Sequence, residues 1–116
     1  MAKVFGMHTL ELQPGCDENE FEEFMRNDFI PSYSRVPGQT AHLLKGDRGE
    51  RTGKYLVLIE LESPERRDQI YPSEGGVADD VVQLVGDIEM LVSKVRSFLV
   101  EFPDSGFTDY VTVSSP

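Results

Sequence analysis

The chain has 116 residues, of which 11 are Lys or Arg and 21 are Asp or Glu, so its formal charge at pH 7 is −10. This length predicts one domain over residues 1–116, and the charge argues against binding to nucleic acid or to an anionic membrane surface. No stretch approaches the roughly 20 apolar residues of a membrane span, and the N-terminus lacks the apolar core of a signal peptide. With Cys16 as the single cysteine, we expect an acidic cytoplasmic protein without disulfides.

The first part of the chain predicts a strand, a helix and a second strand. Residues 3–12 alternate loosely and contain β-branched and aromatic side chains, which favours a strand. Asp17 and Glu20 have the spacing of a capping box, and phenylalanines then recur at helical spacing, so we expect a helix over residues 18–29 that ends at Pro31. Residues 40–45 predict a short second strand.

The middle of the chain predicts a hairpin and a short helix. Residues 54–62 are the strongest strand signal, and the charged segment 46–53, which contains three glycines, is typical of a hairpin loop. The second and third strands should therefore be antiparallel neighbours. Ser63 followed by Pro64 predicts the start of a helix through residue 70 or 71.

The last part of the chain predicts one long helix and a final strand. Residues 77–102 carry apolar side chains three and four positions apart, which predicts an amphipathic helix that stops at Pro103. Gly86 lies inside this pattern and permits a bend. Residues 107–114 predict the last strand, followed by a tail at 115–116.

The resulting order is βαββαβ, the α+β arrangement of ferredoxin-like folds, with a four-stranded antiparallel sheet in the order 4-1-3-2 and the helices on one face. The third strand is apolar on both sides. One side carries Tyr55, Val57, Ile59 and Leu61, and the other carries Leu56, Leu58 and Glu60. A monomer would expose one of these surfaces, so we expect two chains to associate sheet against sheet as a homodimer.

This element order, the chain length and the two-sided third strand resemble the dimeric α/β-barrel superfamily over nearly the whole chain. The resemblance implies a fold in which two ferredoxin-like chains enclose small cavities. Members of that superfamily include cofactor-free monooxygenases, isomerases, haem-binding enzymes and barrels without assigned chemistry. The absence of Trp, and the position of both histidines outside the predicted second-helix region, disfavour haem. We therefore expect no cofactor.

The candidate site consists of side chains expected to point into the barrel. The wholly apolar side of residues 54–62 is the better surface for helix packing, which leaves the side with Glu60 for the interior. His8 and His42 are also assigned inward, each expected opposite Leu58. The predicted catalytic residues are Glu60, His8 and His42, and the predicted substrate-binding residues are Tyr110, Leu58 and Leu56.

Two functions fit this pattern. In the first, an interior pocket binds an apolar small molecule while a His or Glu moves a proton, as in cofactor-free monooxygenases and isomerases. In the second, the protein is a non-catalytic binding or assembly module and the barrel is only its dimer interface. A metal site is disfavoured because the backbones of His8 and His42 would stand about 9 to 10 Å apart, across two strand spacings.

Overall fold

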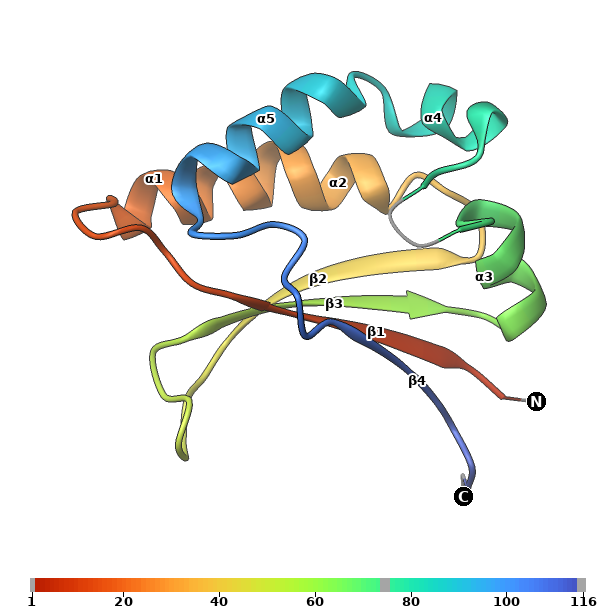
Figure 1. Ribbon diagram of the computed structural model, residues 1–116, viewed down its shortest axis with the longest axis horizontal. Coiled ribbons are helices and arrows are strands. Elements are labelled where there is room, and N and C mark those ends of the chain that lie inside the picture. The colour runs from red at the N-terminus through yellow and green to blue at the C-terminus, as the bar shows by residue number, and fades with distance from the viewer. Residues whose placement is uncertain (1, 74–75, 115–116) are drawn as a thin grey trace.

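The computed structural model describes residues 2–73 and 76–114, so the predicted tail at 115–116 lies outside the described residues. Four antiparallel strands form one sheet, and helices cover one of its faces (Figure 1), which confirms the predicted α+β class. The elements in chain order are β1 (Val4–Leu10), α1 (Glu18–Phe24), η1 (Met25–Phe29), α2 (Ile30–Tyr33), β2 (Gln39–Lys45), β3 (Tyr55–Leu61), α3 (Pro64–Ile70), α4 (Asp79–Val85), α5 (Ile88–Phe98) and β4 (Thr108–Val111).

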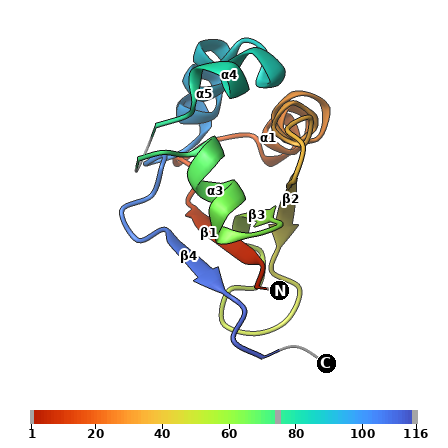
Figure 2. The same ribbon diagram turned by 90° about the vertical axis from the view of Figure 1, so that its right-hand side faces the viewer.

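The strands lie in the order β2-β3-β1-β4, so β1 and β3 form the centre of the sheet and β2 and β4 its edges. Counted from β4, this is the expected order 4-1-3-2. Figure 2 shows α1 and α5 side by side above the sheet, while none of the helices formed by the described residues lies over the opposite face. We call this uncovered surface the open face. The final strand is shorter than the predicted range 107–114, since β4 spans Thr108–Val111.

The first helix continues past Pro31, so the prediction that it ends there is wrong. Proline lacks an N–H group and its ring collides with the carbonyl four residues earlier, which would stop an undisturbed α-helix. Here the turns over Met25–Phe29 widen to a π-helix, in which the Ile30 N–H donates to the Met25 carbonyl. The widened turns accommodate the proline, and the helix reaches Tyr33. This extension adds the buried Tyr33 to the helix.

The predicted long helix over residues 77–102 is two helices, α4 and α5. Gly86 ends α4 with φ +100° and ψ −138°, a backbone conformation that residues other than glycine rarely adopt. Asp87 then caps α5 by accepting a hydrogen bond from the Met90 N–H. The apolar stripe is kept across the break, since Val81, Val85, Leu91 and Val95 are all buried.

The core lies between the helices and one face of β3. Tyr55, Val57, Ile59 and Leu61 are buried there, while Leu56, Leu58 and Glu60 alternate onto the open face and are half-buried. The wholly apolar side of this strand therefore packs against the helices, as the sequence predicted.

Candidate active site

The structure separates the residues that the sequence placed together. On β1, His8 pairs with Val57 and Met7 pairs with Leu58, so the predicted pairing of His8 with Leu58 is wrong by one residue. Because side chains alternate along a strand, a shift of one residue moves a side chain to the other face. His8 therefore lies on the helix-covered face of the sheet, with Val4 and Leu10, and not on the open face.

The other candidates share the open face. His42 lies opposite Leu58, as predicted, and Leu56 lies two residues along the same side of β3. Tyr110 pairs with Phe5 of β1 and is 54% exposed. These side chains form a mainly apolar surface with a single imidazole, and they lie on the opposite side of the sheet from His8.

Glu60 lies at the end of the open face. It is flanked by Phe5 on β1 and Thr40 on β2. Its side chain is 34% exposed and its carboxylate lies 3.9 Å from the Lys3 ammonium. The predicted cluster of Glu60 with His8 is therefore not formed, and the role of Glu60 stays a prediction.

His8 has a partner that the sequence reasoning missed. Asp104 Oδ1 lies 3.1 Å from His8 Nδ1, and since a carboxylate only accepts, Nδ1 is the donor. The second oxygen of Asp104 accepts from the backbone N–H of Thr9 at 3.2 Å and from its hydroxyl at 3.3 Å. The Asp104 carboxylate is thus fixed by three hydrogen bonds to β1. In the neutral imidazole this bond places the proton on Nδ1 and the lone pair on Nε2.

Asp104 reaches β1 because the chain after α5 runs back alongside the N-terminal strand. The Val100 N–H donates to the Glu11 carbonyl, and the Gln13 N–H donates to the Phe98 carbonyl. These contacts bring the following loop over His8. In the sequence, Asp104 stands in a loop after Pro103 and shows no motif, so no local signal marked it.

A row of rings surrounds the His8 side chain. His8 stacks on Phe107 with ring centroids 5.0 Å apart and lies 6.0 Å from Phe102. Phe102 in turn lies 6.0 Å from Phe29, which lies 4.6 Å from Tyr33. We call Tyr33, Phe29, Phe102, His8 and Phe107 the aromatic row. The side chains of His8 and Asp104 are only 18% and 13% exposed, so the pair lies in largely apolar, poorly hydrated surroundings.

Two tyrosines and a glutamine lie at the Tyr33 end of the aromatic row. The Gln39 side chain, 5% exposed, donates from Nε2 to the Tyr33 carbonyl at 2.8 Å, and the Tyr71 hydroxyl donates to Gln39 Oε1 at 2.6 Å. Burial raises the pKa of Tyr33 and of Tyr71, so both phenols stay protonated. Asp109 lies close by, with one oxygen packed against Gly6 and the other 2.7 Å from Arg67 Nη1.

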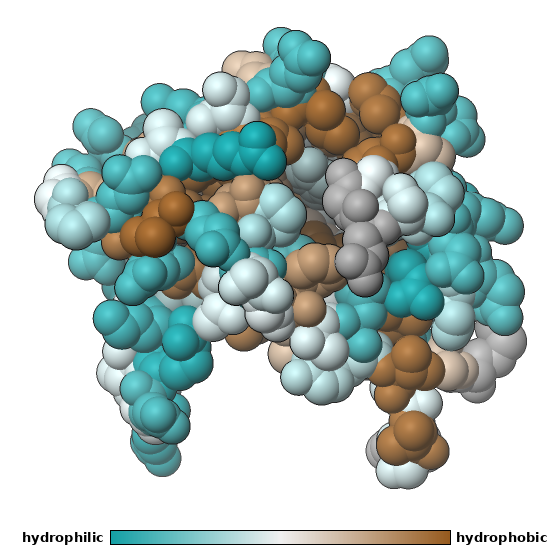
Figure 3. Space-filling model, viewed as in Figure 1, coloured by the Kyte–Doolittle hydropathy of each residue, from teal (hydrophilic) through white to brown (hydrophobic). Residues whose placement is uncertain are grey.

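Figure 3 shows apolar side chains gathered among the helices on this face of the molecule, above a paler and more polar surface over the sheet. The aromatic row brings a histidine held by a carboxylate together with apolar rings and a phenol. Such a combination suits proton transfer on a small apolar molecule.

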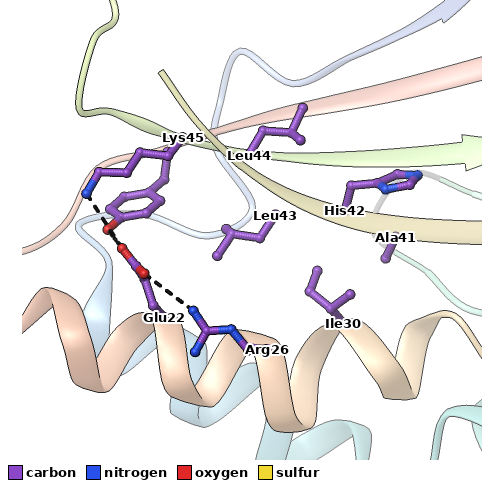
Figure 4. A pocket seen from close by; sticks show the side chains of 9 residues that line it. Glu22, Arg26, Ile30, Ala41, His42, Leu43, Leu44 and Lys45 are labelled. Carbon is purple, nitrogen blue, oxygen red and sulfur yellow. Dashed lines mark hydrogen bonds and ion pairs between the residues drawn. The ribbon is translucent and has the colours of Figure 1, made fainter. Parts of the chain in front are cut away.

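A cavity of about 410 Å³ lies beside the edge strand β2. Ile30 and Leu43 point into it, whereas His42 points to the other side of β2 (Figure 4). Its charged rim is already paired, because Glu22 lies 3.6 Å from Lys45 and 3.5 Å from Arg26.

A comparison of the sequence with protein-family models found no matching family, and a comparison with curated proteins found no similar sequence. None of the helices in residues 2–73 and 76–114 combines the length and hydropathy needed to cross a membrane. Function is therefore inferred from the geometry of the site.

Proposed function

We propose that the protein is a small-molecule enzyme in which His8 moves a proton on a planar, apolar substrate bound at the aromatic row. The observation that carries this proposal is the hydrogen bonding that fixes the orientation of the His8 ring. Asp104 accepts from Nδ1 while it is itself fixed by Thr9, and this arrangement presents Nε2 as a base of fixed orientation.

The chemistry follows from this orientation. His8 Nε2 takes a proton from a C–H or O–H group of the substrate, and the electron pair of the broken bond stays on the substrate as an enolate or phenolate. The Asp104 carboxylate stabilises the imidazolium that forms. Return of the proton to a different carbon would make the enzyme an isomerase. Reaction of the anion with dioxygen as co-substrate would make it a cofactor-free monooxygenase.

The test is proton exchange on a planar enolisable ketone, 2-tetralone, in D2O, followed by ¹H NMR. The wild-type protein should accelerate loss of the C1 proton signal above the buffer rate. His8→Gln should reduce the acceleration by about 10²-fold or more, the usual contribution of a positioned general base. Asp104→Asn should reduce it by a smaller factor, because the base remains but its orientation is lost.

His42→Gln is the matched control, since His42 is the other histidine and lies on the open face. It should exchange 2-tetralone at the wild-type rate. Equal rates for wild type and His8→Gln would show that His8 is not the base. Loss of activity in His42→Gln alone would place the chemistry on the open face, with the originally predicted residues.

A second candidate function is assembly, and the open face favours it. Phe5, Met7, Leu44, Leu56, Leu58 and Tyr110 present apolar surface there without a covering helix. We propose that a second copy of the chain covers this face, giving a ferredoxin-like homodimer of the dimeric α/β-barrel kind. A twofold axis parallel to the strands and between the two sheets would bring β2 of one protomer beside β4 of its partner. These are the two edge strands, and they run antiparallel.

A further inference from the structure

The cavity beside β2 has an apolar part between the helix and the strand. Ile30 on the helix and Leu43 on the strand point into it, and Ala41 lines it two residues before Leu43 (Figure 4). Ile30 and Leu43 are only partly buried, so the core leaves part of each side chain free for contact. A volume of about 410 Å³ lies near the lower end of the range for ligand pockets. The space therefore suits a small molecule with an apolar body.

The other part of the cavity carries more positive than negative charge. Arg26 and Lys45 line it together with one carboxylate, Glu22, which lies 3.5 Å from the first and 3.6 Å from the second. Glu22 also accepts a hydrogen bond from the Tyr55 hydroxyl. Glu18, which does not line the cavity, lies 3.9 Å from Lys45 and offsets its charge in part. The unmatched positive charge therefore falls on Arg26.

The Arg26 guanidinium has hydrogen-bonding capacity to spare. Its side chain is 67% exposed, and within residues 2–73 and 76–114 its one ion pair is the 3.5 Å contact with Glu22. A guanidinium has five N–H donors in a planar fork that matches a carboxylate. Arg26 lies in η1, a helix type that is frequent at functional sites, and Ile30 follows four residues later on the same side of the helix (Figure 4). A group bound to Arg26 would thus have apolar surface next to it.

We infer that this cavity binds a small monocarboxylic acid with an apolar chain. The carboxylate accepts hydrogen bonds from Arg26, and the chain lies against Ile30 and Leu43. A single negative charge matches the single unmatched cation, whereas a doubly charged phosphate would leave one charge unpaired beside Glu22. No residue of the aromatic row lines the cavity, so the inference does not rest on proton transfer by His8.

The experiment compares octanoate, which is ionised at pH 7, with 1-octanol, which has the same chain length and no charge. Both are titrated into ¹⁵N-labelled protein and followed by NMR. Wild type should bind octanoate about 3- to 10-fold more tightly, and the amide signals of Ile30 and Leu43 should shift. Arg26→Gln should remove this preference. Arg48→Gln is the control, because it makes the same change in charge in the loop between β2 and β3, which extends away from the helices (Figure 1), and it should keep the preference.

A second variant tests the apolar part of the cavity. Leu43→Ala should weaken binding of both probes by about 3-fold or more and leave the preference for octanoate unchanged, because it removes only apolar contact. Added NaCl should reduce the preference in wild type, since salt screens the partly exposed guanidinium. Circular dichroism checks the fold of each variant.

Three results would overturn the inference. The first is a preference for octanoate that survives in Arg26→Gln. The second is octanoate binding that shifts the amide signals of the open face and not those of Ile30 and Leu43. The third is no binding of either probe to wild type.

Discussion

Tyr55 connects the sheet to α1 through a hydrogen bond that its hydroxyl donates to Glu22. This hydrogen bond is the main reason that the pKa of Glu22 lies below its ordinary value of 4.5, with Lys45 and Arg26 adding to the effect and burial opposing it. Glu22 therefore holds its proton less tightly in the folded chain than in the unfolded one. Its contribution to stability is complete above pH 4.5 and is lost as the pH falls through the lower folded value.

Tyr55→Phe tests this account, because it removes the hydroxyl and keeps the buried ring. We expect the free energy of unfolding to fall by about 1 kcal/mol at pH 7. The difference from wild type should shrink as the pH is lowered below 4.5, since protonated Glu22 no longer gains from the hydrogen bond. Urea unfolding at pH 7 and pH 3 measures both values. A difference that stays constant across this range would mean that the tyrosine acts only through packing.

The break between α4 and α5 at Gly86 can be tested by one substitution, because a broken and a continuous helix predict changes of opposite sign in the free energy of unfolding. In a continuous helix, Gly86→Ala would stabilise by roughly 1 kcal/mol. At the observed φ of +100°, an added Cβ is strained, and the variant should instead lose about 1 to 3 kcal/mol. Gly106→Ala is the control, since a Cβ there meets no atom within 4 Å, and its effect should be small. Thermal unfolding of the two variants decides between the continuous and the broken helix.

The open face decides how whole molecules associate. Leu58 lies on the central strand β3 between Met7 and His42, so a sheet-to-sheet dimer would bury it near the centre of the interface. Leu58→Asp should convert a dimer to a monomer, because an unpaired carboxylate would be taken out of water. Light scattering at micromolar concentration measures the mass of both proteins. A monomeric wild type would contradict the assembly proposal. A dimeric Leu58→Asp variant would place the interface elsewhere. Leu84→Asp is the control, since Leu84 is exposed on α4, and it should leave the mass unchanged.

The sequence by itself determined the features that depend on local patterns. Residues with alternating or helical periodicity gave the strands and the first helix turns correctly, and the two sides of β3 could be assigned because one is wholly apolar and the other carries Glu60. The caps at Asp17 and Ser63 were also readable, since a capping side chain binds N–H groups within the next three residues.

Only the tertiary structure decided the site. The face of His8 depends on the register between β1 and β3, and β1 carries both apolar and polar side chains on each face, so nothing local fixes that register to within one residue. Asp104 is brought to His8 by a loop 96 residues later in the chain, and Tyr71 bonds Gln39 across 32 residues. Periodicity carries no information about such contacts, because they form only when separate elements pack together.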